Sequence, residues 1–218
     1  MAFRGGTALH KIYLSGQRFS EDIDLVQVEP IPFGSVMTNI RKVLSPWLGK
    51  PSYKQTEGRV TFYFKYETEI SPKTSVKLKV EANTREQFTV LGYEFKELEC
   101  LSNWFSGSAK IRTFAIEELS ATKLRALYQR KKGRDLFDLW LVLSKLSPDS
   151  AKVISSFERY INHQGLSISK AEFEQNLNAK LADELFIRDV APIILKPEEY
   201  DPIKAGELVT MKLLSQMN

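Results

Sequence analysis

The chain has few residues of the kinds that form covalent or metal cross-links. Its 218 residues include a single cysteine, Cys100, which excludes an intramolecular disulfide and a thiolate metal site built by this chain alone. The two histidines, His10 and His163, are too few for a histidine-rich zinc centre. Disulfide scaffolds and zinc modules are therefore excluded as classes.

Long apolar segments are also missing. No run approaches the roughly 20 residues that a membrane-spanning helix needs, and the N-terminus lacks the hydrophobic region of a signal peptide. The sequence contains no internal repeat and no low-complexity tract. We therefore expect a cytoplasmic protein that has no membrane partner.

The overall composition is that of an ordinary globular protein. Hydrophobic residues make up 43% and charged residues 27% of a chain long enough for one large domain or two small ones. The net charge of +4 and the pI of about 9.0 give a mild basic bias. This bias agrees with a polyanionic partner such as RNA or an NTP, although many proteins without such a partner are equally basic.

The first informative segment begins at Arg4. Gly5 and Gly6 open a stretch whose apolar residues recur at helical spacing. Backbone N–H groups at a glycine turn that opens a helix form an anion site, which here would use Gly5, Gly6 and Thr7. A Gly-Gly pair on its own is most often only a turn. Only residues 1–3 precede the segment, so a strand before it would be very short.

An acidic pair follows on a predicted buried strand over residues 23–28. Because side chains alternate along a strand, Asp22 and Asp24 project from one face. Adjacent carboxylates repel each other unless a cation lies between them, and Mg2+ is the natural candidate because it prefers oxygen ligands. An Asp-x-Asp on its own is usually a solvated strand end or a helix cap. A phosphate site beside metal-binding carboxylates indicates nucleotidyl or phosphoryl transfer.

The joint pattern resembles a known family. Gly-Gly-Thr, a short helix and then Ser-Glu-Asp-Ile-Asp-Leu from Ser20 to Leu25 resemble the nucleotidyltransferase superfamily that includes DNA polymerase beta. They resemble more closely the AbiEii/AbiGii (MenT-like) nucleotidyltransferase toxins of bacterial toxin–antitoxin and phage-defence systems. The resemblance implies an α+β fold, in which a small mixed β-sheet with flanking helices is followed by an α-helical C-terminal domain.

A third carboxylate is implied by the same resemblance. The segment Val-Glu-Ala-Asn-Thr-Arg-Glu resembles the family's strand-end Glu followed by Asn-Thr-Arg-Glu, which makes Glu81 the third metal ligand. Asn83 and Arg85 become candidate substrate contacts. The alternative is that Glu81 is a solvated strand residue whose negative charge balances the charges of Lys77 and Lys79, which project from the same face of the strand.

Two further motifs lie in the second half of the chain. Lys-Leu-x-Ala-Leu and Arg-x-Lys-x-Arg-Asp-x-x-Asp-Leu resemble the third and fourth motifs of the toxin family, although such a basic run is usually a solvated loop. By resemblance, Lys123 reaches the nucleotide phosphates and Asp135 completes the active site. Asp138 is the alternative to Asp135, and the sequence leaves that choice open. Lys11, Arg85 and Arg134 are further candidates for binding the NTP phosphates.

Periodicity gives the remaining elements. Residues 32–48 are predicted as a helix, residues 59–66 and 75–81 as an antiparallel hairpin, and residues 93–96 and 110–114 as short strands that complete the sheet. Later helices are predicted over residues 116–130, 135–143, 151–162, 169–182, 183–194 and 197–214. Their core candidates are Val153, Ile154, Phe157, Phe173, Leu177, Leu181, Leu185, Phe186 and Leu208.

The change to a helical pattern near Phe114 predicts two domains. Residues 1–114 would form the nucleotidyltransferase catalytic domain, and residues 115–218 a helical domain that completes the active-site cleft between them.

The resemblance also implies an activity. The protein would move a nucleoside monophosphate from an NTP to an acceptor hydroxyl, with Mg2+ or Mn2+ held by Asp22, Asp24 and Glu81. The implied acceptor is the 3′ end of tRNA, and the implied partner is an antitoxin encoded nearby in a type IV system. Alternatives are a protein acceptor (AMPylation), an idle nucleotide- or RNA-binding module, and an antibiotic-modifying nucleotidyltransferase.

Overall fold

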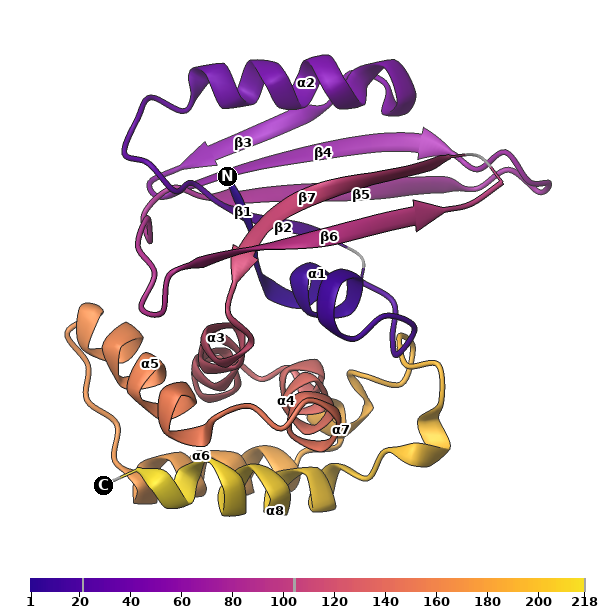
Figure 1. Cartoon of the computed structure of the whole chain (residues 1–218). Helices are drawn as coiled ribbons and strands as arrows, with labels where there is room; N and C mark the ends of the chain where they lie inside the picture. The colour runs from indigo at the N-terminus through magenta and orange to yellow at the C-terminus, as the bar shows by residue number, and fades with distance from the viewer. Residues whose placement is uncertain (21, 104, 218) are drawn as a thin grey trace.

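The computed structural model describes residues 1–20, 22–103 and 105–217 and has a mixed α+β architecture (Figure 1). Its main sheet has five strands in the order β1-β2-β5-β4-β3, and only the β2–β5 pairing is parallel. The five strands are β1 (Ala2–Phe3), β2 (Asp22–Val26), β3 (Ser52–Thr56), β4 (Arg59–Glu67) and β5 (Ser75–Asn83). The mixed sheet confirms the predicted fold class.

One face of this sheet is covered by helix α2 (Gly34–Leu48) (Figure 1). Val60, Phe62 and Phe64 alternate along β4 and pack against apolar side chains of α2. On β2, Ile23 and Leu25 join the same cluster. Since side chains alternate along a strand, the acidic residues between these apolar ones project from the opposite face of the sheet, away from α2. The hydrophobic pattern thus fixes which face carries the carboxylates.

Two strands differ from their predicted place. Strands β6 (Tyr93–Leu101) and β7 (Ser106–Phe114) are longer than predicted and form a separate two-stranded sheet instead of completing the main one. Their backbones pair with each other along all nine residues, and β1 is only two residues long. The two sheets are joined by a side-chain hydrogen bond, in which Thr113 Oγ1 donates to Phe3 O at 3.0 Å, and by apolar packing of Phe114 with Ala2 and Val26 in one cluster.

The glycine segment folds back against β2. Helix α1 (Gly5–Ala8) continues into the π-helical turn η1 (Leu9–Tyr13). Arg4 N–H donates to Asp24 O at 3.0 Å, and Thr7 Oγ1 donates to Asp22 O. The start of the helix is therefore attached to the strand that carries the acidic pair.

The described residues after Phe114 are mainly helical. The helices are α3 (Ile116–Gln129), α4 (Gly133–Lys145), α5 (Ser150–His163), α6 (Lys170–Leu181), α7 (Glu184–Arg188) and α8 (Pro202–Lys212), with short 3₁₀ turns η2 (Pro197–Glu199) and η3 (Leu214–Gln216). The predictions for residues 183–194 and 197–214 were too long, because Pro192 and Pro202 interrupt the helical hydrogen bonding. Helix α4 starts at Gly133, where a Cβ would come within 2.1 Å of Phe186 O.

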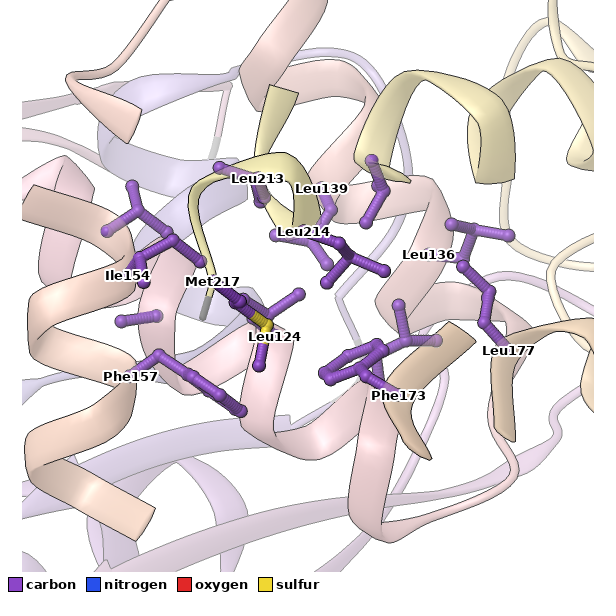
Figure 2. Close-up of a cluster of buried hydrophobic side chains, with 14 of the residues drawn as sticks. Leu124, Leu136, Leu139, Ile154, Phe157, Phe173, Leu177, Leu213, Leu214 and Met217 are labelled. Atoms are coloured by element: carbon purple, nitrogen blue, oxygen red, sulfur yellow. The ribbon is translucent and has the colours of Figure 1, made fainter. Parts of the chain in front are cut away.

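These helices enclose a hydrophobic core. Figure 2 shows Leu124, Phe157 and Phe173 facing each other from α3, α5 and α6, with Leu214 near the chain end. Most predicted core residues of these helices are buried, but the prediction for Leu185 is wrong, since its side chain is 80% exposed.

A second apolar cluster spans both halves of the chain. It joins Leu9 and Val26 to Leu119, Phe137 and Val190. The last described strand, β7, ends at Phe114, where the sequence predicts a domain boundary. This cluster nevertheless packs residues before that boundary against residues after it. Within the residues that the structure describes, no helix has both the length and the apolar character to cross a membrane.

Candidate active site

Two adjoining cavities lie between the exposed face of the sheet and helix α3. Their volumes are about 430 and 320 Å³. Both are lined by Gly6, Asp24, Arg59, Glu81, Lys123 and Arg130. Carboxylates come from the sheet and cations mainly from the helical half, so the space between them suits a ligand that carries both phosphate and metal.

Three predicted carboxylates share this face. In the parallel pairing of β2 with β5, Asp24 is the Cα partner of Glu81, and Asp22 is the partner of Lys79. Asp24 and Glu81 line both cavities, whereas Asp22 lines the smaller one. The strand register therefore brings together residues that are almost 60 positions apart in the sequence.

Gly5 lets the helix start approach this acidic group. Its φ of +66° lies in the left-handed region, and a Cβ at this position would stand 2.4 Å from Asp24 Oδ2. Gly6 is tight as well, because a Cβ there would stand 2.6 Å from Arg18 Nη2. The first intrahelical bond runs from Ala8 N–H to Arg4 O, so the N–H groups of both glycines precede it.

Lys79 and Arg59 lie among the carboxylates. Lys79 Nζ is 2.7 Å from Asp22 Oδ2 and 3.6 Å from Glu81 Oε2. Arg59 Nε is 3.4 Å from Glu81 Oε1. Burial raises the pKa of Asp24 above its usual value, and the charges of Glu81 and Asp22 add to this, while Lys123 and Lys79 oppose it. Such a perturbed carboxyl group in a cavity is typical of a functional site.

Lys123 reaches the cavities from α3 but is held tightly. Its Nζ lies 2.7 Å from Asp138 Oδ2 and 3.1 Å from Asp135 Oδ1, and its side chain is only 7% exposed. Burial alone would lower the pKa of Lys123, yet these two carboxylates raise it, so the ammonium stays charged. A fixed positive charge thus faces the carboxylates of the sheet.

Asp135 and Asp138 are both fully buried and do not belong to the described linings of the two cavities. Asp135 receives two hydrogen bonds from Arg130, at 2.6 and 2.8 Å. Asp138 receives two from Arg18, at 2.7 and 2.9 Å, and lies 2.7 Å from His10 Nε2. Both aspartates therefore orient cations of the site, and the choice between them as the motif aspartate stays open.

The other predicted phosphate contacts are dispersed. Arg134 lines the smaller cavity and is bound to Asp189. Thr7 is buried with its hydroxyl on the β2 backbone. Lys11 is exposed on η1 and is not among the described lining residues. Arg85 lines a third cavity, of about 390 Å³, which adjoins the larger one at Arg59.

Sequence reasoning missed a buried ion network in the wall of the larger cavity. Arg125 donates to both oxygens of Glu86, at 2.6 and 3.0 Å, and Arg4 Nη1 lies 3.2 Å from Glu86 Oε2. Burial alone would raise the pKa of Glu86, but hydrogen bonds and charge from Arg125, with the charge of Arg4, lower it to about 2. The only signal in the sequence was that Arg4 begins the glycine segment and Glu86 ends the Asn-Thr-Arg-Glu motif.

The carboxylates match Mg2+ in donor type. Asp22, Asp24 and Glu81 offer only oxygen ligands, on two neighbouring strands, and two of them already share the cationic Lys79 Nζ. In the described part of the chain, however, no three or more His, Cys, Asp or Glu side chains are grouped closely enough to form a metal site as they stand. Metal binding would require these side chains to reorient.

The fold and the site define a mixed α+β protein with carboxylates on a sheet face opposite fixed helix cations. The chain belongs to the family described as "Nucleotidyl transferase AbiEii toxin, Type IV TA system" (toxin–antitoxin), which matches residues 1–205. The resemblance drawn from the motifs is thereby confirmed. The family implies a cognate antitoxin.

The solved structures that are similar to this chain include two nucleotidyltransferase-type proteins. MenT4, a nucleotidyltransferase toxin from Mycobacterium tuberculosis H37Rv, has 15% identity and a TM-score of 0.48, over 95% of this chain and 84% of its own. An antigenic nucleotidyltransferase-like protein from Paracoccidioides brasiliensis has 20% identity and a TM-score of 0.42, over 88% and 82% of the two chains. Comparison with curated proteins gives no match.

Proposed function

We propose that this toxin transfers a nucleoside monophosphate from an NTP to the 3′ end of tRNA and releases pyrophosphate. The observation that carries the proposal is the pairing of Asp24 with Glu81 in one cavity with Gly6 and Lys123. Carboxylates for a metal and donors for phosphates are the two requirements of nucleotidyl transfer, and both face the same space.

The phosphates of the NTP lie on the helical side of the cavity in this proposal. The N–H groups of Gly5, Gly6 and Thr7 are the donors to the β- and γ-phosphates. Lys123 adds a fixed charge where negative charge develops, and it needs little reorganisation because two aspartates already hold it. Arg130 lines the same cavities and extends the positive side.

Asp22, Asp24 and Glu81 would hold Mg2+, with Mn2+ as a substitute. Bound there, the metal would supply Lewis-acid stabilisation of the phosphoryl oxygens. The acceptor hydroxyl attacks the α-phosphorus while the bond from that phosphorus to the bridging oxygen of pyrophosphate breaks. Glu81 is the acceptor for the proton of the attacking hydroxyl, since it lies on the acidic side opposite Lys123.

An RNA acceptor agrees with the charge of the molecule and with the third cavity. The net charge is +4, and Arg59 and Arg85 line the cavity that adjoins the larger one. We assign Arg85 to the acceptor side, because it lies away from Lys123 and the glycine turn. Phosphate contacts of this kind would make RNA binding depend on salt concentration.

The test is incubation of the purified protein with total tRNA, Mg2+ and each of the four α-labelled NTPs. We expect label on tRNA with the wild-type protein, a loss of about 100-fold or more with Asp24→Ala, and a loss with EDTA. Glu207→Gln is the control, since Glu207 is exposed on α8 and is not among the described lining residues of the three cavities.

Each other outcome identifies an alternative. Label on protein would show that the acceptor is a protein hydroxyl and not tRNA. Label on neither, with tRNA still bound, would favour an idle binding module. Full activity of Asp24→Ala would contradict the role of the acidic face.

A further inference from the structure

The third cavity lies between the turn that joins β3 to β4 and the C-terminal end of α5. Gly58 of that turn and His163 of α5 are among its lining residues. Arg59 and Asn83 line both this cavity and the larger one, so the two spaces adjoin. A ligand in the larger cavity can therefore extend into the third.

The third cavity differs chemically from the smaller of the two main cavities. More than half of the described residues that line the smaller cavity are lysine or arginine, which suits phosphates. The third cavity is lined by as many carboxylates as arginines, two of each, and by the side chains of Asn83, His163 and Gln164. Amide groups beside an aromatic ring are the groups with which proteins recognise unstacked nucleobases.

His163 is the aromatic residue of this lining. It is exposed, and its ring centroid lies 4.6 Å from that of Phe88, with 58° between the two ring planes. The Phe88 ring in turn lies 5.0 Å from the ring of Tyr160, which is one turn earlier on α5. Packed rings thus support the imidazole, and a supported aromatic ring at an open cavity is suited to stack a base.

The place of the cavity along the sheet relates it to the proposed chemistry. Asn83 lies two residues after Glu81 on β5, so both side chains project from the same face, about 7 Å apart along the strand. Arg59 is the Cα partner of Asn83 on β4. A group bound at Asn83 is therefore next to a group bound at Glu81.

Resting on the proposed function, we propose that the third cavity binds a nucleobase of the acceptor RNA, stacked on His163. The base is that of the nucleotide before the 3′ end, and the terminal nucleotide then places its hydroxyl at Glu81 in the larger cavity. Asn83 and Gln164 offer amide groups to the edge of the base. The NTP does not occupy this space, because its phosphates lie with the cations of the helical half. His163 is thus a binding residue for the acceptor strand.

Steady-state kinetics with tRNA and NTP varied separately test this assignment. We expect His163→Ala to raise the KM for tRNA about 10-fold, as the loss of one base stack does, and to change kcat and the KM for the NTP less than about twofold. His163→Tyr keeps an aromatic ring and should remain close to the wild type. Lys152→Ala, at an exposed position near the other end of α5, is the control and should show no change.

A second experiment measures binding and needs no variant to show the effect. The wild-type protein is given fluorescently labelled tRNA in which the nucleotide before the 3′ end lacks its base. We expect this tRNA to bind about 10-fold more weakly than intact tRNA. His163→Ala should add no further loss with the abasic tRNA, because both changes remove the same stack.

An unchanged KM for tRNA in His163→Ala would overturn the inference. A rise confined to the KM for the NTP would also overturn it, because the base at His163 would then be that of the NTP. Equal binding of intact and abasic tRNA by the wild type would do the same. These outcomes leave the proposed function standing, whereas a wild-type protein that puts no label on tRNA would contradict the proposed function itself.

Discussion

At the scale of the residue, Gly5 is the position in the site where a side chain would be tolerated least. Its backbone is left-handed, at φ +66°, and its missing side chain leaves room for the Asp24 carboxylate. A methyl group there would stand 2.4 Å from Oδ2, well inside contact distance. Glycine thus meets two requirements at this position: it adopts the left-handed backbone without strain, and it has no Cβ to block the close approach of the backbone to the Asp24 carboxylate.

We predict that Gly5→Ala destabilises the protein by about 1–2 kcal/mol, because an L-residue is strained in this conformation. It should also lower nucleotidyl transfer by about 100-fold, since it displaces Asp24. Gly16→Ala is the matched control. Gly16 has φ +74°, but a Cβ added there would meet no atom within 4 Å, so this variant should lose stability and keep its transfer rate. Thermal unfolding and labelled-NTP assays separate the two effects, and equal transfer rates would contradict the steric argument.

At the scale of the element, Asp138 connects parts of the chain that are far apart in sequence. From α4 it binds His10 on η1, Arg18 before β2, and Lys123 on α3. Burial alone would raise the pKa of Asp138, but the charge of Lys123 and hydrogen bonds from Arg18 and His10 lower it well below its usual value. The carboxylate is therefore ionised in the folded protein.

Asp138→Asn should destabilise the protein by about 3–5 kcal/mol, because it removes the counter-charge of buried Arg18 and one of the two carboxylates that hold Lys123. Asp149→Asn is a control of the same chemistry. Asp149 caps α5 through Ala151 N–H and Lys152 N–H, and asparagine caps a helix about as well. Urea unfolding of the two variants measures the difference. A cost for Asp138→Asn within about 0.5 kcal/mol of the control would show that the network is not essential to folding.

Elements whose side chains alternate or recur periodically could be predicted from the sequence. Helix α5 follows that rule, because it buries one face, and β5 alternates in its apolar residues. Strand β4 alternates less regularly, since Thr61 is buried between Val60 and Phe62. Strand β3 has five exposed residues, so it carries no apolar signal. The pairing of β6 with β7 depends on which edge is available in space, and local pattern does not encode it.

The same distinction holds within the site. Alternation predicts the common face of Asp22 and Asp24, whereas the place of Glu81 beside them was implied by the family resemblance and depends on the pairing of β2 with β5. The contacts of Arg18 and His10 with Asp138 could not be found, because each joins residues more than a hundred positions apart and local pattern does not encode such pairs. Alternation also placed Lys79 on the same face as Glu81, but its pairing with Asp22 depends on strand register.

At the scale of the whole molecule, Glu86 binds the two halves of the chain together. It follows β5 and receives hydrogen bonds from Arg125 on α3 and from Arg4 before α1. With both arginines in place, the pKa of Glu86 is about 2 in the folded protein, below its ordinary value of 4.5. Because folding lowers this pKa, the ionised group stabilises the folded state above pH 4.5, and this stabilisation is lost as the pH falls towards 2.

We therefore predict that Glu86→Gln lowers the free energy of unfolding by on the order of 2 kcal/mol at pH 7, after allowance for solvent screening. The gap from the wild type should narrow steadily between pH 4.5 and 2, because the wild-type carboxylate becomes protonated there. Urea unfolding at pH 7, 5, 4 and 3 measures that gap, and Glu57→Gln, at an exposed carboxylate, should show none. A gap that stays constant with pH would mean that Glu86 acts through packing alone, and that its charge does not hold the sheet against the helical half.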